Sequence, residues 1–76
     1  MAKTLILHND NVSEFMDVVH NVSNICEMDA IDSEVIVLKA HCQGSCPLMS
    51  GDCEELFNMQ TLFEEKGILT TIENMF

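Results

Sequence analysis

The chain has very few basic residues, and this scarcity excludes one class of partner. Only three of its 76 residues are Lys or Arg, against 13 Asp and Glu, so the formal net charge is −10 at pH 7. Binding to nucleic acid needs clustered Lys and Arg that neutralise phosphates, so no nucleic-acid partner is expected. The negative field instead favours a cationic ligand or a basic surface on another protein.

Two kinds of hydrophobic segment are also missing from the sequence. It has no apolar run long enough to cross a membrane, so no membrane partner is expected. It lacks the basic segment, apolar segment and cleavage site of a secretory signal, and we therefore expect a cytoplasmic protein. The apolar fraction of 47% is sufficient for one core. Because 76 residues are too few for a second core, residues 1–76 are expected to form a single domain.

The four cysteines show none of the common zinc-binding spacings. There is no Cys-x-x-Cys pair, and without a sign of secretion the thiols are expected to be reduced and buried or half-exposed. Cys26 falls on an apolar helical stripe, where a free thiol behaves as a small hydrophobe. No cofactor is expected. A metal-binding module that uses His41, Cys42 and Cys46 is kept as an alternative, because these three residues lie close together in the sequence.

Strand-like and helix-like segments alternate along the chain. The first half of the pattern predicts a strand at 3–8, a helix at about 14–26 with Ser13 as its N-cap, and a second helix that begins at Met28 or Asp29. The second half predicts an edge strand at 47–49 and a turn at 50–52. A third helix that ends at Lys66 and Gly67 and a strand at 69–73 follow. The order βααβαβ predicts an α+β fold, a small two-layer domain in which three helices cover a three-stranded sheet.

Apolar residues at helical spacing indicate which side of each helix is packed. These residues are Phe15, Val18, Val19, Val22 and Ile25 in the first helix, Ile31, Val35, Leu38 and Cys42 in the second, and Leu56, Met59 and Phe63 in the third. The β-branched run 35–37 would also suit a strand. A helix is preferred there because the segment is long, begins with acidic residues and reaches Gly44 where helices commonly end.

A polar cluster follows the first predicted strand directly. Asn9 and Asp10 stand at its end, just before a helix, where backbone groups are also free to bind a small polar group. Asn and Asp are favoured in turns as well, so a turn without further function is the alternative. His41 is a third polar candidate, whereas His8 and His20 are expected on the surface without a role.

Several segments of the sequence resemble the ClpS family, adaptors of the bacterial Clp protease machinery. They are Leu5-Ile6-Leu7-His8-Asn9-Asp10-Asn11, the helix that begins near Phe15, Ala40-His41 followed by Gly44, and Thr71-Ile72-Glu73. Gly44-Ser45-Cys46, Gly51-Asp52 and Gly67 are most similar to the short form of Bacteroidetes-like bacteria. The resemblance implies a protein that binds the N-terminal residue of substrates, the N-degron, typically Phe, Tyr, Trp or Leu, and delivers these substrates to the Clp ATPase and its protease.

The resemblance also implies roles for individual residues. Asn9, Asp10 and His41 would bind the α-amino group of the substrate. The hydrophobic pocket and its gate would comprise Ser13, Phe15, Val18, Val37, Ala40 and Ile68, with Phe15 at the gate. Asp52, Glu55 and Phe57 would contact the N-domain of the Clp ATPase. An interaction domain without delivery to Clp is the alternative at this point.

The residue types suit this binding chemistry better than catalysis. A peptide N-terminus is mostly an ammonium at neutral pH and offers three donors. The amide oxygen of Asn9, the carboxylate of Asp10 and a neutral nitrogen of His41 are three acceptors. The sequence shows no recognisable nucleophile and base pair and no phosphate-binding glycine loop, so an enzyme is not expected.

Overall fold

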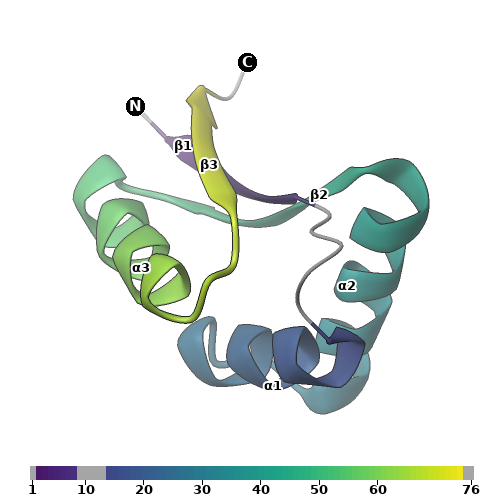
Figure 1. The fold of residues 1–76 in the computed structure, drawn as a ribbon. Helices are drawn as coiled ribbons and strands as arrows, with labels where there is room; N and C mark the ends of the chain where they lie inside the picture. The colour runs from purple at the N-terminus through teal and green to yellow at the C-terminus, as the bar shows by residue number, and fades with distance from the viewer. Residues whose placement is uncertain (1, 9–13, 75–76) are drawn as a thin grey trace.

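The six predicted elements occur in the predicted order in the computed structural model, which describes residues 2–8 and 14–74 (Figure 1). They are β1 (Lys3–His8), α1 (Phe15–Ile25), α2 (Ala30–Gln43), β2 (Ser45–Gly51), α3 (Cys53–Glu65) and β3 (Thr70–Asn74). The three strands form one sheet, and the three helices lie together on one side of it (Figure 1). The α+β fold predicted from the sequence is therefore confirmed.

Strand β1 lies in the middle of the sheet, between β2 and β3, and is antiparallel to both. Its alternating pattern explains which face is buried, because Leu5 and Leu7 point into the core and are 0% and 2% exposed. The prediction that the second strand is an edge strand is confirmed. The prediction for β3 is shifted by one residue, since Leu69 precedes the strand and is exposed.

The predicted length of the second strand is wrong. Strand β2 runs over seven residues, and its positions 50 and 51, predicted as part of a turn, pair with Thr4 and Lys3 of β1. The register shifts between Leu5 and Ile6, which pair with Met49 and Pro47, so Leu48 is an extra residue in a bulge. A bulge on an edge strand accommodates the missing N–H of proline, and the pairing therefore continues past Pro47.

The first and third helices bury the sides that the sequence predicts. Val18, Val19 and Val22 of α1 and Leu56 and Phe63 of α3 are buried. The four glutamates of α3, at positions 54, 55, 64 and 65, are exposed as predicted. Within the described residues, none of the helices is both long and apolar enough to span a membrane.

The helix ends agree with the sequence in three cases and differ in one. Gly44 ends α2 at φ 95°, and Gly67 follows α3 at φ 75°, both in the left-handed region that glycine adopts without strain. Asp29 occupies the N-cap of α2. The N-cap of α1 is Glu14 rather than Ser13, so that prediction is wrong by one residue, and Ser13 itself lies outside the described residues.

The prediction for the packed face of α2 is wrong. Ile31, Val35 and Leu38 are 76%, 47% and 51% exposed, and Cys42 is exposed as well. The buried residues are instead Ser33, Val37 and Ala40, on the opposite side of the helix. Apolar residues occur on both sides of α2, and the small side chains at 33 and 40 fit the side that lies against the rest of the molecule.

The two histidines outside the predicted site differ in their surroundings. His20 is exposed, as predicted. His8 is half-buried, and its Nε2 forms a hydrogen bond of 2.7 Å with Thr71 Oγ1 across β1 and β3, so it is not a free surface residue. This contact links the end of β1 to β3, the last strand in the sequence.

The two phenylalanines of α3 should contribute unequally to the free energy of unfolding. Phe63 is 0% exposed and Phe57 is 59% exposed. Phe63→Ala should lower the free energy of unfolding by about 3–5 kcal/mol, since it leaves a cavity among core side chains. Phe57→Ala is the matched control, and its cost should stay within about 1 kcal/mol. Urea unfolding followed by circular dichroism measures both, and equal costs would contradict the observed packing of α3.

Candidate functional site

The predicted polar site has one member within the described part of the chain. Asn9 and Asp10 lie outside the described residues. His41 lies in the last turn of α2 and is exposed. The helix ends three residues later, where the amide of Gly44 donates a 2.8 Å hydrogen bond to the carbonyl of Ala40. His41 therefore lies in a helical turn whose backbone hydrogen bond is formed.

Three segments that are distant in sequence meet at the end of β1. His8, the last residue of β1, pairs with Ser45, the first residue of β2. The amide of His8 also donates a 3.2 Å hydrogen bond to the carbonyl of Leu69, just before β3. His41 is four residues before Ser45, and Ile68 is one residue before Leu69. The fold thus brings the end of α2 and the connection after α3 to the same end of the sheet.

The predicted pocket residues that the structure describes belong to one apolar cluster. Val18 of α1, Val37 and Ala40 of α2, and Ile68 of the α3–β3 connection are 8%, 6%, 2% and 3% exposed. Phe15, at the start of α1, is half-buried and packs against this cluster. Core packing alone accounts for such burial, so their role in binding stays a prediction. Ser13, the sixth predicted member, is outside the described residues.

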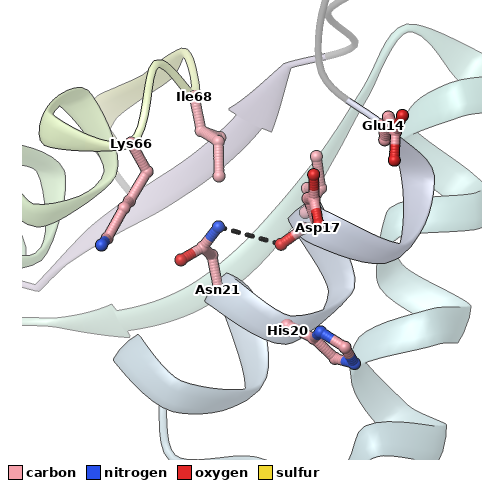
Figure 2. Close-up of a pocket in the computed structure, with 7 residues that line it drawn as sticks. Glu14, Asp17, His20, Asn21, Lys66 and Ile68 are labelled. Carbon is pink, nitrogen blue, oxygen red and sulfur yellow. Dashed lines mark hydrogen bonds between the residues drawn. The ribbon is translucent and has the colours of Figure 1, made fainter.

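An open hollow of about 370 Å³ lies beside this cluster, between α1 and the α3–β3 connection (Figure 2). Its lining comprises Glu14, Asp17, Val18, His20, Asn21, Lys66 and Ile68. Two of the predicted pocket residues, Val18 and Ile68, therefore contribute to it, and the remaining members are polar. Figure 2 shows Lys66 and Ile68 on the segment across from α1, with Asn21 on the side of α1 that faces them.

The polar lining of the hollow was missed at the level of sequence. Glu14, Asp17 and Asn21 stand at intervals of three and four residues, which places them on one side of α1, and this spacing is a readable signal. Asn21 Nδ2 donates a 2.9 Å hydrogen bond to the carbonyl of Asp17. The approach of Lys66 from the other wall has no signal in the sequence, because it depends on the packing of α3 and its connection.

The three predicted contacts with an ATPase are at the start of α3, but Glu55 and Phe57 lie on different sides of the helix. Asp52 is the N-cap of this helix and Glu55 is in its first turn, where acidic groups are favoured by the helix dipole. Both residues are exposed, and Phe57 is 59% exposed. Its exposure leaves Phe57 accessible to a partner, and its role in a contact stays a prediction.

The residues of the metal alternative do not converge. His41 and Cys42 are exposed on α2, whereas Cys46 is 8% exposed and belongs to the core cluster. Among residues 2–8 and 14–74, no group of three or more His, Cys, Asp and Glu side chains is placed to hold a metal ion. All four cysteines are free thiols. The expectation of burial or half-exposure is correct for Cys26 and Cys46 and wrong for Cys42 and Cys53, which are exposed.

The thiols should differ in reactivity. Burial raises the pKa of Cys26 from 9.0 to about 11, so its thiolate fraction near pH 8 should be about 100-fold lower than that of an unperturbed thiol. Iodoacetamide should therefore modify the exposed Cys42 and Cys53 well before Cys26, as followed by peptide mass spectrometry. The same reaction in denaturant is the control, since all four rates should then become similar. Equal rates at Cys26 and Cys53 in the native protein would contradict this prediction.

The chain matches known proteins both in its sequence family and in its fold. Residues 2–67 match the model of the family described as ATP-dependent Clp protease adaptor protein ClpS. No curated protein matches the chain. Among solved structures, the fold is similar to that of Agrobacterium tumefaciens ClpS2 bound to L-phenylalaninamide, with a TM-score of 0.86 and 18% identity. That match covers 97% of this chain and 96% of the other.

Proposed function

Because this chain belongs to the ClpS family of ATP-dependent Clp protease adaptor proteins, we propose that it binds the N-terminal residue of substrate proteins and delivers them to the Clp ATPase and its protease in the cytoplasm. The family match carries this proposal, since it extends over 66 consecutive residues (2–67) and includes Asn9, Asp10 and His41. The family consists of adaptors of a protease, so no catalytic step is assigned to the chain itself.

The fold supports a shared polar site for Asn9, Asp10 and His41. Asn9 and Asp10 directly follow His8 in the chain, and His8 pairs with Ser45. The end of α2, which carries His41, enters β2 at that same residue. Consecutive Cα atoms are about 3.8 Å apart. Asn9 and Asp10 are one and two residues beyond His8, so the chain length allows them to lie near the last turn of α2.

These three side chains would recognise the ammonium group at the start of a polypeptide. The ammonium offers three donors, and each needs an acceptor when it leaves water. An internal peptide group has one N–H and no charge, so it would leave acceptors unpaired at a cost of about 1–3 kcal/mol for each group. The net charge of −10 adds a field that favours a cation.

The apolar cluster beside the end of β1 would receive the first side chain of the substrate. Burial of a Phe or Leu side chain there would contribute about 1.5–3 kcal/mol. Val37, Ala40 and Ile68 are at most 6% exposed, so an entering side chain must displace a neighbour. Phe15 is half-buried at the start of α1 and is the residue proposed to move as the gate. The comparison protein binds L-phenylalaninamide, which joins a free α-amino group to a phenyl ring. That ligand supports the same two requirements here.

Removal of a proposed acceptor should weaken the binding of peptides that begin with Phe or Leu. Asp10→Ala and His41→Ala should each raise the Kd by about 10-fold to 150-fold, the loss expected for a hydrogen bond to a charged group. Fluorescence anisotropy with a peptide labelled at its C-terminus measures this change. Glu64→Ala, an exposed carboxylate of α3, is the matched control and should leave the Kd unchanged.

An acetylated peptide and a series of first-residue variants test which feature of the chain end is recognised. The same peptide with an acetylated N-terminus should not bind, since it has neither the charge nor the three donors. Peptides that differ only in the first residue would rank Phe, Tyr, Trp and Leu and so define the preferred N-degron. Tight binding of the acetylated peptide, or unchanged affinity in both variants, would sink the proposal.

Delivery to the ATPase would use the start of α3. Asp52, Glu55 and Phe57 are exposed at the start of α3, with Phe57 about 160° around the helix from Glu55, so the proposed contact with the N-domain of the Clp ATPase would wrap around this end of the helix. An aromatic side chain at the centre of such a contact often contributes more binding energy than its neighbours. Phe57 is therefore the proposed anchor.

The two steps of the proposed function should be separable by mutation. Phe57→Ala should lower the affinity for the ATPase N-domain by at least about 10-fold, a loss typical of an anchor residue, and leave peptide binding intact. Leu62→Ala is the matched control, because Leu62 is 46% exposed and lies five residues further along α3, on another side of the helix. Calorimetric titration of each variant with the N-domain measures the effect. Equal binding by wild type and Phe57→Ala would instead favour an interaction domain without this delivery contact.

A further inference from the structure

The outward side of α2 carries a seam of apolar residues that the proposed function does not use. The seam consists of Ile31, Val35, Leu38 and Cys42. The first three are 76%, 47% and 51% exposed, and Cys42 is exposed too. Figure 1 shows α2 at the edge of the molecule, which agrees with the exposure of these side chains. Contiguous exposed apolar residues of this kind mark a contact with another molecule.

The spacing within the seam is that of a coiled coil. Successive members are separated by four, three and four residues, which is the alternation of the two apolar positions in a heptad repeat. Such a seam fits another helix with the same spacing. The remaining large exposed apolar residues, such as Met16, Leu62 and Leu69, lie outside α2.

The charged residues beside the seam indicate which helix fits it. Asp32 and Lys39 are seven residues apart on one flank, and Glu34 and His41 are seven residues apart on the other. In each flank the acidic residue is in the first half of α2 and the basic one in the second half. When a second copy of α2 lies antiparallel across the seam, each flank lies beside the same flank of the other copy. The acidic residue of one copy is then next to the basic residue of the other.

From this pattern we propose that α2 pairs with α2 of a second copy of the chain to form an antiparallel two-fold dimer. Asp32 then faces Lys39 of the other copy, so the symmetry provides two opposite-charge pairs, and Glu34 faces His41 of the other copy, whose ring N–H can donate a hydrogen bond to the carboxylate. In the seam, Ile31 lies opposite Cys42 and Val35 opposite Leu38. Such an interface is isologous, with the same patch used by both copies.

The antiparallel arrangement is favoured over the parallel one because it gives every flanking residue a partner. In a parallel pair Glu34 would meet Lys39, but Asp32 and His41 would have no polar partner across the seam. Antiparallel helices also place the positive end of one dipole beside the negative end of the other. The helix of 14 residues is about 21 Å long, and each chain has a charge of −10. The dimer is therefore weak and depends on concentration.

Sedimentation equilibrium over a concentration series tests the dimer. The mass of the wild type should rise from monomer toward dimer, and Leu38→Glu should remain monomeric because it places carboxylates in the seam. Leu62→Glu is the matched control, at a similar exposure on α3, and should dimerise like the wild type. A wild type that stays monomeric at every concentration would overturn the proposal and assign the seam to a different protein.

A charge exchange tests the partner and its direction. Lys39→Glu should weaken the dimer by about 10-fold or more, because two attractive pairs become repulsive. Combining it with Asp32→Lys should restore the dimer, since the exchange recreates both pairs across the two-fold axis. A double variant as weak as the single one would contradict the antiparallel pairing. Neither substitution touches His41, so the result is independent of the proposed substrate site.

Disulfide trapping distinguishes the two directions directly. In a Cys53→Ser background, Ile31→Cys should form an inter-chain disulfide between position 31 and Cys42 under mild oxidation, identified by mass spectrometry. The background variant alone should yield little dimer linked through two Cys42 residues. A dominant Cys42–Cys42 link would support a parallel pair and overturn the antiparallel one. Circular dichroism of each variant confirms that the fold is intact before the comparison is made.

Discussion

The central position of β1 is the constraint on which the rest of the structure depends. Both of its edges are paired, with β2 on one side and β3 on the other, and Leu5 and Leu7 are almost completely buried. The strand therefore determines where β2 starts and where the chain enters β3. His8 at its end pairs with Ser45 and donates to the carbonyl of Leu69. The last turn of α2 and the connection after α3 are brought to one end of the sheet by this pairing.

The same packing that forms the core also decides what α2 presents to solvent. Small residues, Ser33 and Ala40, occupy its inner side together with Val37. The larger Ile31 and Leu38 then lie on the outer side. Because a helix has only one side to bury here, the apolar residues on the other side become available for a second helix. The proposed substrate site and the proposed dimer seam thus share one element, with His41 at the boundary between them.

Much of the fold could be predicted from the sequence, because most local signals agree with the tertiary structure. Gly44 and Gly67 mark helix ends, and alternation in β1 marks a half-buried strand. The errors occur where local signals were ambiguous. The sequence predicts a strand start at Pro47 and a turn at Gly51, whereas a bulge lets β2 continue through both. In α2, apolar residues on both sides left no single amphipathic face to identify.

The sequence by itself determined the order of the elements, the acidic charge and, through resemblance, the family and the candidate residues Asn9, Asp10 and His41. These properties depend on neighbouring residues or on composition. Only the tertiary structure decided which side of α2 is buried, that Lys66 lies across from α1, and that the end of α2 meets the end of β1. Each of these depends on contacts between segments far apart in the chain, whose free energies come from burial and pairing that no local pattern encodes.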